Sequence, residues 1–541
     1  MSKKAQVEEV TLAFDLHELP TAQHRAGLSG LIFQIDAMGR DGYQRPDKLV
    51  PVIKKLTATT AEIAFTRDSM QGVFDELYVA KPVEVVVETR WPDETKPKPG
   101  EYFVSKKDPK TGVVKQATGF PYDVVQPQAP ALKRHLVGNR GSWLELWREM
   151  LWAIPRGGNN VRSRAPFIDL ANGRPSGEGE SAWTQAVDFQ DRRAKSQFKT
   201  EPISGALILG AQAINAEGVS FSGRVDQNLL LHFWQLVVLT FVPQVVARKD
   251  GKVERVGYVL AIPDVADLIG FRVGFPEILQ NLEAKDPRHT PPNARLDLPA
   301  QAGLETLRRL RNAARDEAIA KYVRSVQRGG LGKRRGDYRA PAASKAAREW
   351  GRCVRGVETY HMFKLGTNVK LVSFSRVDDR PGLTEEYDRI DKSFRNPLFR
   401  AGLMRSLLRD RPWHWGMIEP FAEYPHRFFL ETEETPTYLP HFGRDARALF
   451  TAHQQEIRGM TPDEMIDEEK FKHLGQIVRN LITSYVNRTT ACPAIGRDST
   501  TRTSSPSSSP TIPTRRSTPT TSSSATWWRP AAPTGPRSRR S

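Results

Sequence analysis

The sequence is poor in cysteine and has no long uncharged apolar run. Its two cysteines, Cys353 and Cys492, are too few for a disulfide framework or a four-cysteine zinc site, and they suit a reducing compartment. The most apolar stretch, residues 229–246, carries polar residues and a proline, which favours a buried helix over a membrane span. Residues 1–10 lack the apolar core of a secretory signal. We therefore expect a cytoplasmic protein with no membrane partner.

Catalytic signatures are also absent from the sequence. It contains no GxxxxGK[ST], GxSxG or HExxH motif. Two acid pairs, Asp378–Asp379 and Glu385–Glu386, could in principle hold a metal, but adjacent exposed acids are usually only solvated. His414 lies between two tryptophans, a pattern that favours a packed aromatic corner over a general base. The sequence therefore predicts a protein that is not an enzyme and has no metal or cofactor.

Positive charge is what the sequence has in excess. Lys and Arg number 80 against 62 Asp and Glu, which gives a formal net charge of +18. The residues after Cys492 supply part of this excess with eight arginines and one acid, and the rest of the chain remains basic without them. Such a balance indicates an anionic partner, either nucleic acid or an acidic membrane surface.

Hydrophobic patterning predicts an α+β fold. We expect a mixed α+β portion over residues 1–290, a mainly helical domain over 291–490 and a disordered tail over 491–541. The tail is rich in Ser, Thr, Pro and Arg and cannot bury a core, and its composition resembles a GC-rich gene read out of frame.

The predicted elements follow from apolar spacing and turn residues. Strands are expected at 10–16 and 257–263, and helices after Thr21, at 141–154, at 304–326, at 397–408, at 445–457 and at 463–486.

The segment RGGNNVRSR combines residue types that can approach a phosphate. Its candidates for nucleic-acid binding are Arg156, Asn159, Asn160, Arg162 and Arg164. Glycine allows close approach of the backbone, Asn can bond base edges or sugar, and Arg pairs with phosphate oxygens. The alternative is a solvated loop that follows a helix.

A second basic segment, RGGLGKRRGDYR, contains the candidates Lys333, Arg334, Arg335 and Arg339. A flexible basic linker is the alternative that its glycines favour.

A third candidate set lies where the helix after Thr21 begins. Gln23, His24 and Arg25 occupy its first turn, where free backbone N–H groups favour an anion. The alternative is ordinary surface or capping.

Three long stretches carry a family resemblance. Leu19–Leu31, Ala206–Val246 and Gly257–Leu268 resemble the large-subunit family of type I CRISPR interference complexes, and within it the MYXAN variant of type I-A. The similarity extends from about Val10 to Val486 and stops before the Ser- and Thr-rich tail.

The resemblance implies a non-catalytic large subunit of a crRNA-guided antiviral surveillance complex. Such a subunit contacts crRNA and target DNA, examines the motif that flanks the target, and presents the displaced strand to a helicase-nuclease recruited in trans. Its other partners would be the remaining subunits of the CRISPR complex. The resemblance also implies a role in fruiting body development, aggregation and sporulation. Some relatives carry a cysteine zinc cluster, which the two distant cysteines of this chain cannot form.

A different class of function fits the same composition. The chain could be a cytosolic developmental regulatory protein that acts through protein or nucleic-acid partners outside a CRISPR complex. A third interpretation, a nucleic-acid-processing enzyme, is disfavoured because the sequence has no credible acid or metal cluster.

Overall fold

A computed structural model gives the fold of the chain. The residues it describes are 7–39, 46–87, 102–107, 114–153, 161–194, 200–203, 207–209, 221–246, 253–282, 291–329, 353–365, 368–413, 415–416 and 445. All of them belong to one compact unit, Met1–Tyr485.

A small antiparallel sheet and two helices form the N-terminal part. The sheet has the order β1-β3-β2, with β1 at Val10–Asp15, β3 at Thr60–Phe65 and β2 at Val52–Leu56. Helix α1, Ala22–Met38, follows β1, and helix α2, Arg67–Tyr78, follows β3. Helix α2 begins with a capping box in which Thr66 and Ser69 bond each other's backbone N–H groups, which stabilises this end of the helix.

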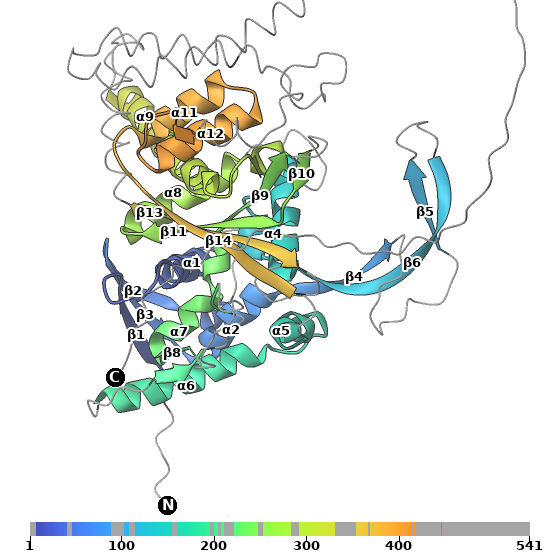
Figure 1. The fold of residues 1–541 in the computed structure, drawn as a ribbon. Helices are drawn as coiled ribbons and strands as arrows, with labels where there is room; N and C mark the ends of the chain where they lie inside the picture. Colours follow the sequence, from blue (N-terminus) through green and yellow to red (C-terminus); the bar gives the residue numbers. More distant parts are fainter. Residues whose placement is uncertain are drawn as a thin grey trace, which may run out of the picture. The chain divides into compact units, whose positions relative to one another are not determined.

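The central sheet joins distant parts of the chain. Its order is β10-β9-β11-β13-β14, all antiparallel, and the short strand β12 runs parallel to β9. The strands are β9 Leu239–Val246, β10 Val253–Arg255, β11 Tyr258–Val265, β12 Arg295–Leu296, β13 Val354–Leu365 and β14 Asn368–Asp378. Strand β11 therefore pairs with a strand that begins almost 90 residues later in the sequence (Figure 1).

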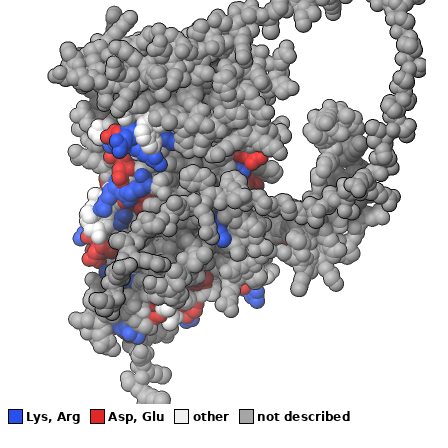
Figure 2. Space-filling view, in the orientation of Figure 1, with Lys and Arg blue, Asp and Glu red and all other residues white. Residues whose placement is uncertain are grey.

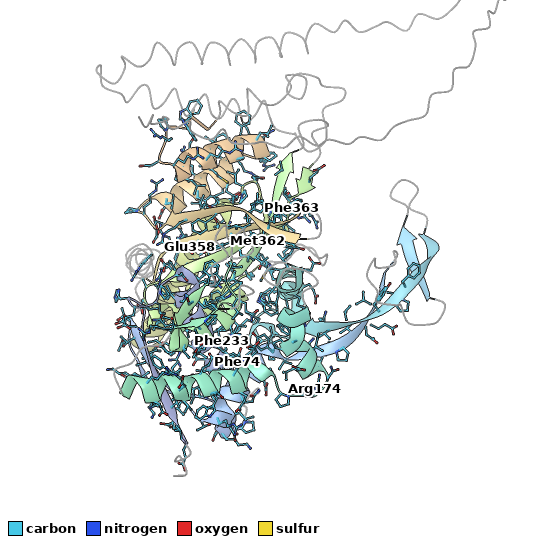
Figure 3. The ribbon with its side chains drawn as sticks, turned by 60° about the horizontal axis from the view of Figure 1, so that its bottom comes forward. Phe74, Arg174, Phe233, Glu358, Met362 and Phe363 are labelled. Atoms are coloured by element: carbon cyan, nitrogen blue, oxygen red, sulfur yellow. The ribbon has the colours of Figure 1, made fainter. Side chains whose placement is uncertain are left out.

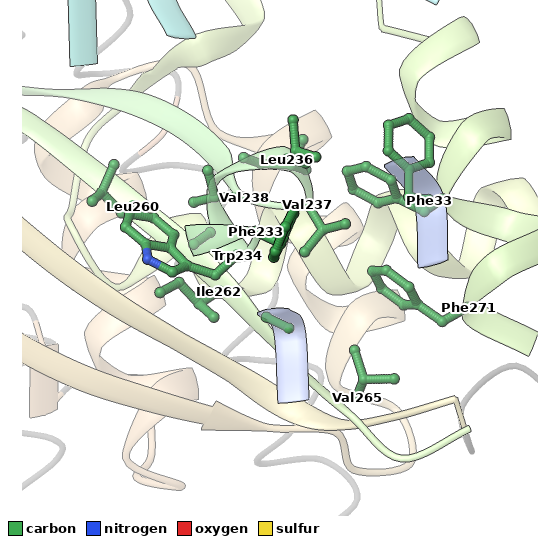
Figure 4. Close-up of a cluster of buried hydrophobic side chains, with 14 of the residues drawn as sticks. Phe33, Phe233, Trp234, Leu236, Val237, Val238, Leu260, Ile262, Val265 and Phe271 are labelled. Atoms are coloured by element: carbon green, nitrogen blue, oxygen red, sulfur yellow. The ribbon is translucent and has the colours of Figure 1, made fainter. Parts of the chain in front are cut away.

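The largest described core surrounds β11. Val259–Val265 is buried along its whole length, because helices cover both faces of the strand. Aromatic side chains of the 229–236 turns, among them Phe233 and Trp234, pack with Leu260 and Ile262 of β11 (Figure 4). Phe74 of α2 reaches Phe233 edge-on, with ring centroids 5.3 Å apart (Figure 3).

Helix α1 lies unusually close to these turns. A Cβ atom at Gly27 would stand 2.1 Å from the carbonyl oxygen of Leu230, and one at Gly30 would stand 2.1 Å from that of Phe233. Only glycine allows this approach, and α1 also packs against β11.

Among the described residues, two helices lie between β11 and β13 in the sequence, and two more follow β14. They are α8 Leu268–Gln280, α9 Gln301–Gly329, α11 Leu383–Ser393 and α12 Pro397–Leu408. Helix α9 packs on the sheet through Gly303, which lies against Val377 and Thr359, and it also contacts α8 and α11 (Figure 1).

A third sheet has the order β4-β6-β5. The first half of β6, Val114–Pro127, pairs with β5, Tyr102–Lys107, and its second half pairs with β4, Ala80–Val87. Helix α5 packs on β4 and β6. The remaining elements are α3 Pro130–Lys133, α4 Gly141–Ala153, α5 Val161–Ala171, α6 Gly177–Ala194, β7 Thr200–Pro202, β8 Ser222–Arg224 and α7 Val225–Asn228, with 3-10 turns at 47–49, 138–140, 229–232, 234–236 and 292–294.

Several expectations are confirmed. The α+β class holds for the described residues, and the strands at 10–16 and 257–263 and the helices at 22–38, 141–153, 301–329 and 397–408 are present. The helices expected at 445–457 and 463–486 and the tail at 491–541 lie outside the described residues, apart from Asp445.

The helix expected over residues 229–246 is wrong. The segment is buried, as predicted, but it forms two 3-10 turns and then strand β9. An apolar run that is buried on all sides has no polar face, so its periodicity does not distinguish helix from strand. The β-branched residues and Pro243 in its second half are compatible with β9 and unfavourable in a helix interior.

The segment expected to be mainly helical, 291–490, contains β13 and β14 among its described residues. Both strands extend the sheet of the N-terminal portion, so this sheet crosses the boundary predicted at 290/291.

Candidate nucleic-acid interface

The first turn of α1 is a structural junction. Thr21 caps the helix, and its hydroxyl accepts a bond from the His24 N–H at 3.3 Å. The amide of Gln23 donates to the Leu207 carbonyl and accepts from the Leu209 N–H at 3.2 Å. Gln23 and His24 are only 3% and 5% exposed, so their polar atoms are occupied inside the protein.

His24 is held in its neutral form. Its Nδ1 lies 2.7 Å from the Thr21 hydroxyl. Burial, and then the neighbouring charge of Arg25, lowers the pKa of His24 from 6.5 to about 4. A neutral, buried imidazole has little attraction for a phosphate at neutral pH.

Arg25 connects α1 to the central sheet. Its Nε donates to the buried carboxylate of Asp264 on β11, and its Nη1 donates to the Leu19 carbonyl at 2.7 Å. The other Asp264 oxygen lies 2.8 Å from Arg376 of β14. Two arginines thus neutralise one carboxylate, and these contacts favour a structural role for the Gln23–His24–Arg25 set over the predicted phosphate contact.

The structure describes only part of the RGGNNVRSR segment. Arg156, Asn159 and Asn160 lie outside the described residues, and Arg162 and Arg164 fall in the first turn of α5, where the backbone is described. Because α5 packs on β4 and β6, this segment opens the helix that lies beside the long strand β6.

Lys333, Arg334, Arg335 and Arg339 lie outside the described residues, between the end of α9 at Gly329 and the start of β13 at Val354.

Charge is nearly balanced in the described part of the chain. Most of the formal +18 falls in segments outside the described residues. Among the described side chains that are coloured in Figure 2, basic and acidic groups lie interspersed. Arg308 of α9, for example, lies 3.2 Å from Asp388 and 3.0 Å from Asp391 of α11. Arg308 thus links helix α9 to helix α11.

The acid pairs considered as metal ligands are engaged by arginines. Arg376 pairs with Asp378 at 2.6 Å, Arg311 pairs with Asp379 at 2.7 Å and with Glu385 at 3.0 Å, and Arg389 pairs with Glu386. Among the residues that the structure describes, no group of three His, Cys, Asp or Glu side chains has the arrangement of a metal site.

The thiol of Cys353 is buried. Burial, and then the charges of Asp267 and Asp379, raises its pKa to about 12. The side chain therefore stays a neutral thiol, which is a poor nucleophile and metal ligand.

One exposed cluster was missed by the sequence reasoning. Arg409, Arg411 and Trp415 follow helix α12, and Trp415 is 37% exposed with the Arg409 guanidinium over its ring. The sequence RDRPWHWG contained a signal, because arginine beside tryptophan is typical of single-strand binding surfaces. The aromatic corner expected around His414 is described only at Trp413, which is partly buried, and at Trp415.

Within the described ranges, no helix has the length and apolar character that crossing a bilayer requires.

Comparison with known families identifies the architecture. A sequence model of the Type I-B CRISPR Cas8b N-terminal domain matches residues 50–319, and one of the Type I-B CRISPR Cas8b C-terminal domain matches residues 354–493. The chain belongs to the Cas8b family of CRISPR large subunits. It is therefore a large subunit of a CRISPR interference complex, a system of antiviral defence. A search of curated proteins gave no match.

The two Cas8b domains share the central sheet. Strand β11 lies in the N-terminal match and β13 in the C-terminal match, and β11 pairs with β13 along its whole length. The basic segment with Lys333 and Arg339 falls in the interval between the matches. Cas8 large subunits are generally non-catalytic components of their complexes, in agreement with the catalytic motifs that the sequence lacks.

Proposed function

We propose that this Cas8b-family subunit contacts guide RNA and target DNA in a crRNA-guided complex and has no catalytic activity of its own. The observation that carries the proposal is the match to both Cas8b domains on one basic chain. In RNA-guided recognition, base pairing reads most of the target sequence, and protein reads a short flanking duplex motif and the backbone. A subunit with that task needs cations near phosphates and no reactive group.

The basic segments are the proposed contacts. Arg156, Asn159, Asn160, Arg162 and Arg164 would lie along one stretch of backbone phosphates beside α5. The segment that contains Lys333, Arg334, Arg335 and Arg339 would add a second contact between the two Cas8b domains. Its high density of positive charge, in a chain whose described residues are nearly neutral, supports this assignment.

The remaining partners follow from the proposal that the subunit is not catalytic. A non-catalytic large subunit requires the other subunits of the complex to hold the guide and a helicase-nuclease recruited in trans to degrade the target. These steps take place in the cytoplasm, where crRNA and invading DNA meet.

Two finer proposals rest on the sequence resemblance. The first is that the chain belongs to the type I-A-like MYXAN branch, although the matching family models are of type I-B. The second is a role in fruiting body development, aggregation and sporulation.

The test compares target binding by the assembled complex with and without this subunit. The probe is duplex DNA that matches the guide and carries the flanking motif. We expect omission of the subunit to lower affinity at least tenfold, because flanking-motif contacts and duplex opening are then lost. Equal affinity of the two assemblies would contradict the proposal.

A further inference from the structure

The loop after α12 has a fixed conformation. Ser406, in the last turn of the helix, is only 2% exposed. Its hydroxyl donates to the Trp413 carbonyl at 3.1 Å and accepts from the Gly416 N–H at 2.9 Å, and its carbonyl accepts from the Arg411 N–H at 2.9 Å. Three hydrogen bonds to one residue thus hold the loop over residues 409–416 against the helix.

Backbone geometry confirms that the loop is constrained. Asp410 has φ = 52°, a left-handed conformation that non-glycine residues rarely adopt. Its carboxylate lies 2.9 Å from Arg380, which supports the turn. A Cβ atom at Gly416 would stand 1.8 Å from the Gly402 carbonyl oxygen, so the chain here must be glycine. Strained residues persist where the surroundings enforce them, which occurs often at ligand sites.

The loop presents two arginines and a tryptophan to solvent. The Arg409 guanidinium lies 4.8 Å from the centre of the Trp415 ring and covers one of its faces. Trp415 is 37% exposed, and both Arg409 and Arg411 are exposed. Neither arginine has a carboxylate partner among the described residues, whereas the nearby Arg400 lies 2.7 Å from Asp297.

We propose that Arg409, Arg411 and Trp415 bind single-stranded nucleic acid. The indole offers a surface on which a base stacks, and the two guanidinium groups bond the adjacent phosphates. Arg409 over the ring adds a cation–π contact that orients both groups before binding. A paired duplex base has its faces covered by its neighbours in the stack, so a single strand fits this site and a duplex does not.

The inference deepens the proposed function and rests on it. A crRNA-guided complex displaces one DNA strand from the target duplex, and that strand has unpaired bases. The rigid loop would hold one nucleotide of an unpaired strand, without sequence preference, because every base has an aromatic face. Single-stranded RNA has the same stacking chemistry, and the experiment compares the two.

The experiment measures binding of the full chain to a fluorescent oligothymidine of about 20 nucleotides by anisotropy. We expect Trp415→Ala to weaken binding roughly tenfold, and Trp415→Phe to retain most of the affinity because phenyl still stacks. Arg409→Ala and Arg411→Ala should weaken binding and reduce its salt dependence. The matched control is Arg389→Ala, which removes an exposed arginine already paired with Glu386 and should leave binding unchanged.

Duplex and RNA probes complete the design. We expect Trp415→Ala to leave affinity for duplex DNA unchanged and to weaken binding of oligouridine as it does oligothymidine. Unchanged oligothymidine affinity in a folded Trp415→Ala chain, or an equal loss on duplex, would overturn the proposal. Melting curves of both Trp415 variants show whether each is folded. Recovery of guide RNA with the wild-type chain is measured separately, so failure of the proposed function is distinguished from failure of this site.

Discussion

At the residue scale, the buried polar groups in the first turn of α1 connect this helix to distant elements through partners inside the protein. Gln23, His24 and Arg25 have the residue types of an anion site. Yet Gln23 is engaged by backbone, His24 by the Thr21 hydroxyl and Arg25 by Asp264. What separates the predicted anion site from the observed structural role is the identity of the partners. They lie more than 180 residues away in the sequence for Gln23 and more than 230 residues away for Arg25. Local sequence cannot contain that information.

Replacement of Arg25 by Ala tests this junction. The change leaves the buried Asp264 with Arg376 alone and should lower the free energy of unfolding by about 1–3 kcal/mol. Urea denaturation measures this loss. Affinity of the folded variant for target DNA should stay within about twofold of wild type, a negligible free-energy change. A large affinity loss without destabilisation would return Arg25 to nucleic-acid binding.

His24 makes stability depend on pH. The folded-state pKa is about 4, below the ordinary value of 6.5, so between these values only the unfolded chain binds the proton. Stability contributed by the neutral imidazole is present above about pH 6.5 and is lost as the pH falls towards 4. We expect His24→Gln to reduce the drop in urea midpoint between about pH 7 and about pH 4.5.

The measurement compares the pH dependence of the urea midpoint between His24→Gln and wild type, because other groups titrate in both proteins. His361 is also buried, with a lowered pKa, and contributes equally to each. Identical pH profiles for His24→Gln and wild type would contradict the account of His24.

At the element scale, the chain is organised around a central sheet of which the local sequence pattern predicts β11 but neither β13 nor β14. The sequence predicts helices over 22–38 and 304–326 because apolar residues recur there at helical spacing, and Thr21 supplies a capping residue for the first. Strands β13 and β14 gave no usable signal. Thr359 and Ser375 are hydrogen-bonded polar residues inside these strands, which obscures the alternation of apolar and polar positions.

Residues 1–290 expressed alone test the importance of this sheet. We expect this fragment to aggregate, because strand β11 loses its partner β13 and the core loses the apolar side of α9. Sedimentation and circular dichroism of the fragment measure the outcome. A soluble fragment with a cooperative melting transition would show that 1–290 is an independent domain after all.

At the scale of the whole molecule, most of the excess positive charge lies outside the residues that the structure describes, which form the folded framework. Many arginines of the framework pair with carboxylates, and most of the excess positive charge lies in segments such as the one that contains Arg156 and the one that contains Lys333. Net charge is readable from the sequence, but the sequence does not distinguish an arginine that is free on the surface from one held in an ion pair.

The triple change Arg156→Ala, Arg162→Ala and Arg164→Ala tests the first of these segments. We expect weaker target binding and a smaller salt slope, since each phosphate contact to duplex DNA contributes about −0.9 to the log–log slope. Titrations at several salt concentrations measure both.

The control removes the same charge from surface ion pairs. Arg67, Arg192 and Arg389 are paired with Glu180, Asp188 and Glu386, and their combined replacement by Ala should leave the slope nearly unchanged. An equal effect of the two triple variants would mean that only net charge matters.

Sequencing of the RNA that co-purifies with the tagged chain from its own cells is the most direct test of membership in a guided complex. The account predicts crRNA, with repeat-derived ends and many different spacers, together with the other subunits of the complex in the same fraction. Recovery of the chain without crRNA and without those subunits, or with messenger RNA alone, would contradict it.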